Sequence, residues 1–295
     1  MKLGIDLGGT KIEIITLDDQ GVERLRRRVP TPQGDYTATL HAIKNLVLSA
    51  ETELRQRGSV GIGTPGSVSK TTGLLKNSNS VHLNGKPVLQ DLETLLQREI
   101  KISNDANCFA LSEATDGAGA GAPVVFGVIL GTGVGAGIVV NGKVLTGPNG
   151  IAGEWGHNPL PWPAANELLG PECYCGLQGC VETFLSGPGM AKLHQKKTGE
   201  ALSPDIIVAR ADAGDEACVF SMQQYENRLA RSLAHVINIL DPDVIVLGGG
   251  MSNIESLYSH VPRLWTRWVF SDRVDTRLVK NKFGDSSGVR GAAWL

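Results

Sequence analysis

The alternation of apolar and polar positions along the chain predicts one short strand plan that occurs twice. Residues 2–7 and 12–17 read as apolar strands on either side of a Gly-Gly-Thr-Lys tip, and residues 22–29 can pair as a third strand. Residues 124–145 repeat the order of strand, Gly-Thr-Gly tip, strand, turn and strand. This repeat predicts a duplicated α/β domain with two Gly-rich loops that face each other across a cleft. The alternative is that so short a similarity arose by chance.

Helical periodicity and apolar runs account for the segments between these strands. Apolar side chains recur at helical spacing in residues 36–57 and, on one face, in residues 216–240. Residues 69–87 lack a sustained period and read as a loop or a small-strand insertion. We expect further helices over residues 89–98, 104–114, 181–197 and 287–295, and further strands over residues 60–63, 100–103 and 244–247.

The length of 295 residues exceeds what one ordinary core needs, so two domains are expected. We place them at residues 1–117 and 118–295, and the final helix could pack back onto the first domain. A hydrophobic content of 41% with 20% charged residues is ordinary for a globular protein, and no apolar run is long enough to span a membrane. A formal net charge of −2 argues against nucleic acid as a partner, and the basic residues 24–28 read as a solvated strand end.

A histidine and three cysteines have the composition of a structural zinc site. His157, Cys173, Cys175 and Cys180 supply one imidazole and three sulfurs, a set that closes a tetrahedral site. Glycines between Cys175 and Cys180 allow a turn tight enough to bring the third sulfur back to the same ion. The second nitrogen of His157 could then contact a ligand, which would couple the metal to a neighbouring binding site.

Buried thiols or a disulfide are the alternative interpretation of these cysteines. Residues 1–20 lack the basic start and apolar run of a secretion signal. We therefore expect the protein in the reducing cytoplasm, where a disulfide is disfavoured.

The Gly-rich tips are candidate phosphate loops because they offer backbone N–H groups to phosphate oxygens. In the first tip, residues 8–11, Lys11 can add a cation, and the preceding Asp6 could hold Mg²⁺. Neither tip matches the Walker pattern, and a Gly-Gly hairpin alone is more often only a turn. Two tips, the Gly-rich strand end at residues 248–250 and a carboxylate together favour a nucleotide.

Asp105 is the candidate catalytic base. Phosphoryl transfer needs a carboxylate that orients the attacking hydroxyl and accepts its proton. Asp105 stands at a predicted strand-to-helix corner, where a role as a helix cap is the alternative.

Several further positions are suited to bind the hydroxyl groups of a polyol, although each alone is more often a surface residue. Trp155 and Trp162 flank them in sequence and could stack on a sugar or belong to the core. The candidate sugar contacts are Gly66, Asn79, Asn104, Glu154, His157 and Glu182.

These motifs, in this order, resemble the ROK family of sugar kinases over essentially the whole chain. The resemblance is carried by Asp-Leu-Gly-Gly-Thr-Lys at 6–11, Pro65-Gly66, Asn-Asp-Ala-Asn at 104–107, Gly-Thr-Gly at 131–133, Glu-Trp-Gly-His at 154–157 and Cys-x-Cys-Gly-x-x-Gly-Cys-x-Glu at 173–182. It implies a duplicated actin-like α/β fold of the hexokinase and Hsp70 type, related to ribonuclease H, with two domains around a central cleft. It also implies ATP and Mg²⁺ in the cleft, a structural Zn²⁺, transfer to a hexose hydroxyl, and a homodimer.

The resemblance also assigns roles to residues. Asp105 becomes the base, and Glu154, His157 and Glu182 match sugar-contacting positions. The residues it places at ATP are Asp6, Gly8, Gly9, Thr10, Lys11, Thr132, Gly133, Gly135, Gly137, Gly248, Gly249, Gly250 and Met251.

Within the family, residues 77–80, 154–162 and 284–294 are most similar to bacterial fructokinases of the manno(fructo)kinase type. They imply transfer to the 6-hydroxyl of fructose, with mannose as a further acceptor. Residues 104–114 are shared with N-acetylglucosamine kinases, so N-acetylglucosamine or glucose is the alternative. A sugar-sensing protein or repressor is the alternative of another class, but a strand beginning at residue 2 leaves no room for a preceding DNA-binding domain.

Overall fold

The computed structural model describes residues 1–78 and 80–295, which divide into two compact units. The predicted domains, 1–117 and 118–295, are continuous in sequence, whereas the first unit gathers three separate segments. Within the described residues, no helix is both long and apolar enough to cross a membrane. The first unit comprises Met1–Gly121, Gly137–Ala152 and Lys282–Leu295, and the second comprises Ala122–Ala136 and Gly153–Asn281.

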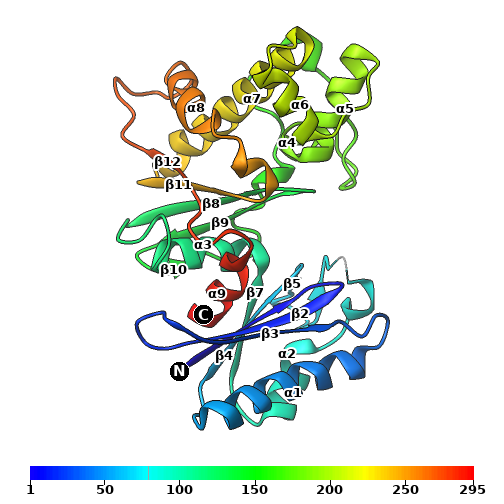
Figure 1. The fold of residues 1–295 in the computed structure, drawn as a ribbon, viewed down its shortest axis with the longest axis vertical. Helices are drawn as coiled ribbons and strands as arrows, with labels where there is room; N and C mark the ends of the chain where they lie inside the picture. The colour runs from blue at the N-terminus through cyan, green and yellow to red at the C-terminus, as the bar shows by residue number, and fades with distance from the viewer. Residues whose placement is uncertain (79) are drawn as a thin grey trace. The chain divides into compact units, whose positions relative to one another are not determined.

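The first unit is built on a sheet with the strand order β3-β2-β1-β4-β7 (Figure 1). Its strands are β1 (Lys2–Leu7), β2 (Lys11–Leu17), β3 (Glu23–Pro30), β4 (Ser59–Thr64) and β7 (Ile100–Asn104). β1, β2 and β3 pair antiparallel, whereas β1, β4 and β7 run parallel. Because parallel strands end at the same edge of a sheet, the last residues of β1, β4 and β7 lie along one edge.

Helices cover both faces of this sheet. They are α1 (Tyr36–Leu54), α2 (Val88–Leu96), α3 (Asp105–Thr115) and α9 (Ser287–Trp294). Ile12 and Ile14 of β2 belong to the core beneath α1 and α2, whereas Ile15 and Leu17 pack against α9. Alternate side chains of a strand point to opposite faces, so the predicted alternation supplies two cores. Figure 1 accordingly shows α1 and α2 on one side of the sheet and α9 on the other.

Helix α9 approaches the sheet and α3 so closely that glycine is required at the contacts. A Cβ atom on Gly61 of β4 would overlap the carbonyl oxygen of Ala292. A Cβ atom on Gly291 would likewise overlap the carbonyl oxygen of Cys108 in α3. The chain terminus is therefore packed into the first unit by backbone-to-backbone contact.

We expect Gly291→Ala to lower the free energy of unfolding by about 2–3 kcal/mol, because neither backbone can move away without disturbing the core. Gly288→Ala is the matched control on the same helix, since no atom lies within 4 Å of its added Cβ. That control should raise stability by about 0.5–1 kcal/mol through helix propensity. Urea unfolding of the two variants measures both effects, and equal stabilities would contradict the close contact.

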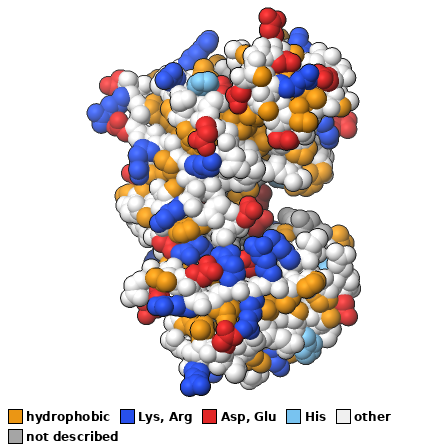
Figure 2. Space-filling model, in the orientation of Figure 1, with side chains coloured by type: hydrophobic (Ala, Val, Ile, Leu, Met, Phe, Trp, Pro, Cys, Tyr) orange, Lys and Arg blue, Asp and Glu red, His pale blue; other side chains and the backbone are white. Residues whose placement is uncertain are grey.

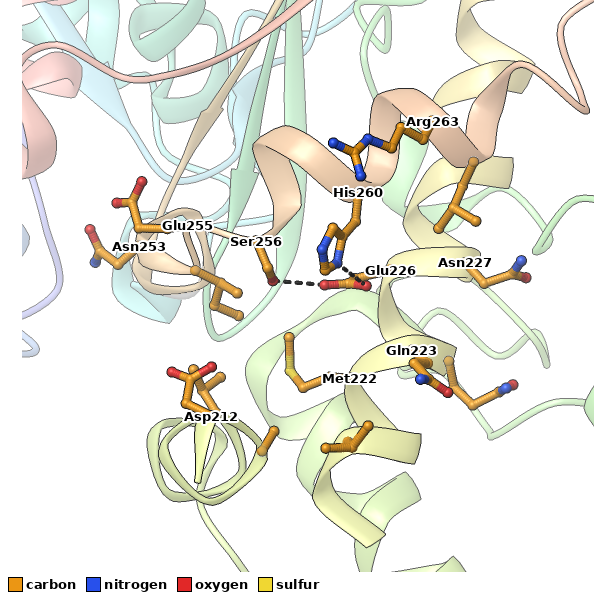
Figure 3. A pocket seen from close by; sticks show the side chains of 16 residues that line it. Asp212, Met222, Gln223, Glu226, Asn227, Asn253, Glu255, Ser256, His260 and Arg263 are labelled. Atoms are coloured by element: carbon orange, nitrogen blue, oxygen red, sulfur yellow. Dashed lines mark hydrogen bonds and ion pairs between the residues drawn. The ribbon is translucent and has the colours of Figure 1, made fainter. Parts of the chain in front are cut away.

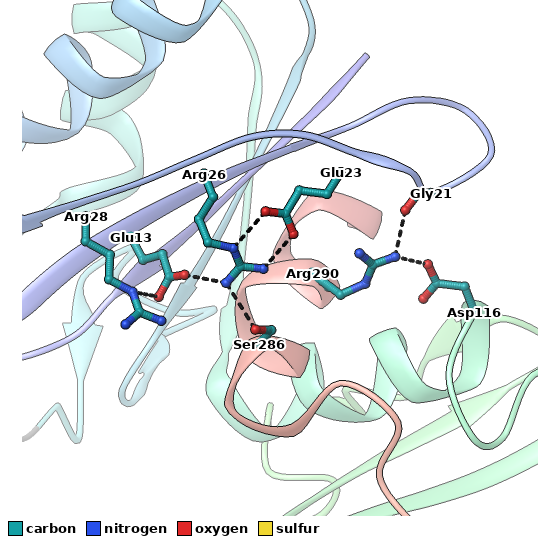
Figure 4. A network of polar contacts seen from close by, with 8 residues as sticks. All are labelled: Glu13, Gly21, Glu23, Arg26, Arg28, Asp116, Ser286 and Arg290. Atoms are coloured by element: carbon teal, nitrogen blue, oxygen red, sulfur yellow. Dashed lines mark hydrogen bonds and ion pairs between the residues drawn. The ribbon is translucent and has the colours of Figure 1, made fainter.

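Ion pairs join β2 to β3, and a hydrogen bond links them to the segment before α9 (Figure 4). Buried Glu13 accepts hydrogen bonds from Arg26 at 2.6 Å and from Arg28 at 2.7 Å. Arg26 also donates to the Ser286 hydroxyl at 3.0 Å. Figure 2 shows Lys and Arg side chains interspersed with Asp and Glu over this part of the first unit. The basic residues 24–28 thus have carboxylate partners within their own unit.

A second sheet has the strand order β10-β9-β8-β11-β12. Its strands are β8 (Val124–Leu130), β9 (Val134–Val140), β10 (Lys143–Val144), β11 (Val244–Gly248) and β12 (Arg277–Lys280). β9 and β10 pair antiparallel, and β8, β11 and β12 run parallel. This order corresponds position by position to that of the first sheet, which confirms the predicted duplication. The boundary between the two units passes through β9.

The helices of the second unit depart from the sequence prediction in two places. They are α4 (Val181–Leu185), α5 (Gly187–Thr198), α6 (Pro204–Asp212), α7 (Glu216–Leu240) and α8 (Leu257–Trp265). The expected single helix over 181–197 is wrong, because Ser186 interrupts it and caps α5 by accepting a hydrogen bond from the Gly189 N–H at 3.1 Å. Helix α6 was not predicted, because it buries a single residue, Ile207, and so has no apolar stripe along one face.

Short elements complete the described chain. The insertion predicted over 69–87 contains the hairpin strand β6 (Leu75–Lys76), which pairs with β5 (Ser67–Val68). The 3₁₀ turns are η1 (Val81–Leu83), η2 (Trp155–His157), η3 (Ala165–Glu167), η4 (Gly250–Asn253) and η5 (Gly284–Ser286).

Candidate active site

Two carboxylates of the first unit lie near each other at the carboxyl edge of its sheet. Asp6 is the penultimate residue of β1, and Asp105 directly follows β7 as the first residue of α3. Burial, followed by the neighbouring charge of Asp105, raises the pKa of Asp6 to about 6, while Lys11 acts in the opposite direction. The structure thus brings together the two acids that the sequence singled out.

Asn104, and not Asp105, caps helix α3. The Asn104 side chain accepts a hydrogen bond from the Asn107 N–H at 2.9 Å, and Asp105 accepts one from the adjacent Ala106 N–H at 2.8 Å. Protein atoms around the Asp105 carboxyl group desolvate it and raise its pKa, although the residue as a whole is exposed to solvent. The capping role that was the alternative for Asp105 therefore belongs to its neighbour.

The pKa of Asp6 predicts how stability depends on pH. An acid with a higher pKa in the folded state binds its proton more tightly there, so its contribution favours folding at low pH and is lost as the pH rises through the folded pKa. The pKa of Asp6 rises from 3.8 to about 6 in the folded state. The free energy of unfolding should therefore fall by up to about 3 kcal/mol across this window on account of Asp6.

Asp6→Asn removes this titration, so we expect the variant to be more stable than the wild type at pH 8 and about as stable below pH 4. Urea unfolding at the two pH values measures the difference. A wild type and a variant with parallel pH profiles would contradict the raised pKa.

The first Gly-rich tip is anchored by Thr31, which directly follows β3, while its outer residues stay exposed. The Gly8 N–H donates to the Lys11 carbonyl oxygen at 3.0 Å, and the Thr31 hydroxyl donates to the Gly8 carbonyl oxygen at 2.8 Å. Gly9, Thr10 and Lys11 are exposed. The tip can therefore offer backbone N–H groups and the Lys11 ammonium to a phosphate.

Gly66 has a structural reason to be glycine, whatever its role toward a sugar. Its φ is +82°, and a Cβ atom there would overlap the carbonyl oxygen of Lys76 in β6. The Ser78 N–H donates to the Asn84 side-chain oxygen at 2.9 Å, and the Asn84 amide donates to the Ser78 carbonyl oxygen at 2.8 Å. Asn79, a predicted sugar contact, lies outside the described residues.

Hydrogen bonds join the second Gly-rich tip, residues 131–133, and the adjacent Val134 to the first turns of α4 and α5. A carboxylate oxygen of Glu182 accepts a hydrogen bond from the Val134 N–H at 2.9 Å, and a Cβ atom on Gly133 would lie 2.7 Å from that oxygen. The Gly187 N–H donates to the Gly131 carbonyl oxygen at 2.9 Å. Glu182 thus supports the tip, a contact that the sequence did not predict.

A cavity of about 760 Å³ in the second unit joins this tip to the segment after β11. Thr132 lines it on the side of the tip, and Gly250 and Met251 of η4 line it on another. Helix α6 supplies Pro204 and Val208 as a largely apolar wall. Apolar walls next to a Gly-rich tip suit a nucleoside whose phosphates reach the tip, so we call this the nucleotide cavity.

Four other glycines predicted at ATP lie in or next to strands, and two of them make close backbone contacts. Gly135 and Gly137 lie within β9 and not in the tip, and a Cβ atom on Gly137 would come 2.6 Å from the Ala106 carbonyl oxygen in α3. Gly248 ends β11. The next residue, Gly249, has a φ of +79°, and a Cβ atom there would lie 2.5 Å from the carbonyl oxygen of Leu130, the last residue of β8. Gly137 and Gly249 thus allow close backbone packing, each within its own unit.

The predicted metal ligands form a compact cluster in the second unit. The ligand atoms of His157, Cys173, Cys175 and Cys180 all lie within 4.8 Å of one another. The Cys175 and Cys180 sulfurs are 3.6 Å apart, and His157 Nδ1 is 3.6 Å from the Cys173 sulfur. A tetrahedral site with Zn–S bonds of about 2.3 Å has sulfur–sulfur edges of roughly 3.8 Å. The spacing fits zinc and is too long for the disulfide that was the alternative.

His157 connects this cluster to an exposed tyrosine. Its Nδ1 faces Cys173, and its Nε2 lies 3.0 Å from the Tyr174 hydroxyl. The Tyr174 side chain is 83% exposed. The sequence predicted that the second nitrogen could contact a ligand, and the structure gives it Tyr174 as a partner. A sugar hydroxyl at Nε2 would have to share or replace this contact.

The two tryptophans near the cluster are engaged with other aromatic side chains. Trp155 is buried and meets Phe126 edge to face at 5.8 Å, which places it in the core. Trp162 is half exposed and stacks on Trp268 at 5.3 Å. Glu154 is exposed beside η2. The interpretation of Trp155 as core, and not as a sugar-stacking residue, is therefore the one the structure supports.

Helix α6 is the part of this site that sequence reasoning missed. It lines the nucleotide cavity with Pro204, Asp205 and Val208. Ser203 at the N-cap position followed by proline at the first helical position is a known start signal and could have revealed the helix. Tyr174 had no comparable signal, because its contact depends on the folded cysteine loop.

Known proteins are similar to this chain in sequence and in fold. The model of the ROK family matches residues 2–295. The chain is 43% identical to N-acetyl-D-glucosamine kinase of Pasteurella multocida over 300 residues, covering 100% of this chain and 99% of that protein. The ROK hexokinase of Thermus thermophilus has a TM-score of 0.88 and 31% identity, covering 100% of this chain and 97% of that one. A Streptomyces griseus ROK glucokinase, solved with glucose and AMPPNP, has a TM-score of 0.76 and 27% identity over 99% of this chain and 97% of that one. The chain therefore belongs to the ROK family and is an ATP-dependent sugar kinase.

Proposed function

We propose that the protein transfers the γ-phosphoryl group of ATP to the 6-hydroxyl of N-acetyl-D-glucosamine. The observation that carries this choice of sugar is the similarity, over the whole chain, to proteins named N-acetyl-D-glucosamine kinase, at 43% and 42% identity. Fructose, which the sequence segments favoured, becomes the alternative acceptor together with mannose and glucose.

Asp105 is the proposed general base. Its raised pKa makes the carboxylate a better proton acceptor, and its exposure leaves it within reach of a hydroxyl group. The carboxylate orients the sugar hydroxyl and takes its proton while the new O–P bond forms and the bond from the γ-phosphorus to the leaving ADP oxygen breaks. Asn104, which caps α3, keeps the backbone around Asp105 in place.

The nucleotide cavity is the proposed site of the nucleoside, with Thr132 and Gly133 supplying a hydroxyl and N–H groups to phosphate oxygens. Gly9, Thr10 and Lys11 are proposed as further phosphate contacts. The neighbouring acids Asp6 and Asp105 fit a divalent cation, because burial and then the charge of Asp105 raise the pKa of Asp6, and a cation would offset the repulsion between the two carboxylates. Mg²⁺ bound with ATP supplies neutralisation of the phosphate charge, and Asp6 is the residue proposed to hold it.

The cysteine cluster is proposed to hold a structural zinc ion that fixes the loop carrying Glu154 and His157. This assignment rests on the four donors and their spacing. Glu154, His157, Glu182, Gly66, Asn79 and Asn104 remain proposed sugar contacts. A homodimer, which the resemblance to the family implies, also stays a prediction.

The acceptor is tested by the release of ADP from ATP and Mg²⁺ with purified protein, compared as relative kcat/KM for N-acetylglucosamine, fructose, mannose and glucose. We expect N-acetylglucosamine to be preferred by at least about tenfold, because a site that hydrogen-bonds an acetamido group leaves its polar groups unpaired with the other sugars. A reaction without sugar is the control for ATP hydrolysis. Preference for fructose would replace the proposed substrate and leave the kinase assignment intact.

A further inference from the structure

Glu226 is a buried carboxylate near the middle of α7 whose two oxygens both have partners on another element. Glu226 is 6% exposed. One oxygen accepts a hydrogen bond from the Ser256 hydroxyl at 2.7 Å, and the other lies 2.9 Å from His260 Nδ1, which donates because a carboxylate only accepts (Figure 3). Charge-assisted hydrogen bonds of this kind are stronger than neutral ones. Glu226 therefore ties α7 to the first turn of α8.

The Ser256 side chain bonds Glu226 and does not cap its own helix, α8. It occupies the N-cap position of α8, where a serine hydroxyl ordinarily accepts a backbone N–H, but no such bond forms. Its hydroxyl instead points to Glu226, as does the ring of His260 one turn later. Residues four apart lie on the same helix face, so the two contacts hold the start of α8 from one side.

The start of α8 is joined to η4 by further hydrogen bonds. The Tyr258 hydroxyl donates to the Ser252 carbonyl oxygen at 2.6 Å, and the Ser252 hydroxyl donates to the Gly249 carbonyl oxygen at 2.7 Å. These bonds connect the segment from Gly249 to Tyr258 internally. A displacement of the first turn of α8 would therefore be passed to η4, which lines the nucleotide cavity.

Glu226, Ser256 and His260 line a second cavity, of about 830 Å³. Val208 and Asp212 of α6, Asn253 at the end of η4 and the following Ile254 line both cavities. Glu226 thus stands behind the nucleotide cavity and does not line it. Its bonds fix η4 relative to α7, the helix on which α6 packs.

We propose that Glu226 is a positioning residue for the nucleotide: through Ser256 and His260 it holds η4 at the distance from α6 that the nucleoside requires. The proposal rests on the assignment of the nucleotide cavity under the proposed function. A positioning role predicts a change in the affinity for ATP, with little change in the affinity for the sugar or in turnover at saturating ATP.

Glu226→Ala should weaken ATP binding about tenfold, since it removes two hydrogen bonds to a charged group. Glu226→Gln should keep the affinity within about threefold, because the amide can accept from Ser256 and donate to the other tautomer of His260. Glu167→Ala is the matched control: it removes a buried carboxylate that pairs with Arg228 and Arg231 of the same helix, α7. It should lower stability and leave the affinity for ATP unchanged.

The dissociation constant of ATP and the KM values for ATP and sugar are measured for the wild type and the three variants. Failure of the wild type to bind ATP would overturn the proposed function. A wild type that binds ATP and a folded Glu226→Ala protein of equal affinity would overturn the positioning role alone. If Glu226→Ala does not fold, Ser256→Ala takes its place with an expected rise of about threefold in the ATP dissociation constant, and wild-type affinity there would likewise overturn the proposal.

Discussion

Asp105→Asn should lower kcat by about 10²–10⁴-fold, the size expected when a general base is removed. Asparagine has nearly the same shape and can still accept the Ala106 N–H, and Asn104 continues to cap α3. The variant should therefore fold, bind sugar and bind ATP, but it has no group that accepts the proton of the attacking hydroxyl. Steady-state turnover together with calorimetric binding of the sugar separates the two properties.

Asp116→Asn is a suitable control for this variant, because it removes a carboxylate at the other end of the same helix. Asp116 pairs with Arg290 of α9. We expect Asp116→Asn to lower stability while kcat stays at the wild-type value. Turnover of Asp105→Asn within about threefold of the wild type would contradict the role of Asp105 as the base.

Cys175→Ser should lose the metal ion and much of the order of the cysteine loop. A serine hydroxyl does not ionise at neutral pH and so does not replace the thiolate that zinc needs. Because binding of structural zinc is coupled to folding, we expect the zinc content to fall from about one ion per chain to below about a tenth, with a loss of several kcal/mol of stability. Metal analysis and thermal unfolding of purified protein measure the two effects.

Cys218→Ala is the matched control for the cysteine cluster. Cys218 is buried in α7, outside the four-residue group. Its removal should leave the zinc content unchanged. Full zinc in Cys175→Ser, or a wild type without zinc after purification free of chelator, would contradict the metal assignment.

Local patterns in the sequence predicted most of the scaffold, because the strands and the long helix bury alternate or helically spaced apolar residues. Helix α7 has the predicted bounds, Glu216–Leu240, and it ends where Asp241 turns left-handed before Pro242. Elements with little buried surface escaped prediction. Strand β12 has Leu278 as its buried residue, and α6 has Ile207. A hydrophobic pattern cannot identify an element that buries a single side chain.

The candidate site divides in a similar way. The acids Asp6 and Asp105 and the metal ligands could be proposed from the sequence because the chemistry needs those residue types at those places. Contacts between segments distant in the sequence could not be predicted in this way. Glu226 meets Ser256 some 30 residues later, and Glu182 holds a tip 48 residues before it. Such pairings depend on how whole helices pack together, and the local spacing of residues in the sequence does not predict that packing.

The proposed transfer to the 6-hydroxyl of N-acetylglucosamine is tested by identifying the product formed from ATP and this sugar. Purified, zinc-loaded protein is incubated with both substrates and Mg²⁺, and the sugar is examined by phosphorus and proton NMR. We predict a single phosphate ester at the 6-hydroxyl, formed in equal amount to ADP. An unmodified sugar with folded, ATP-binding protein, or a phosphate at another hydroxyl, would contradict it.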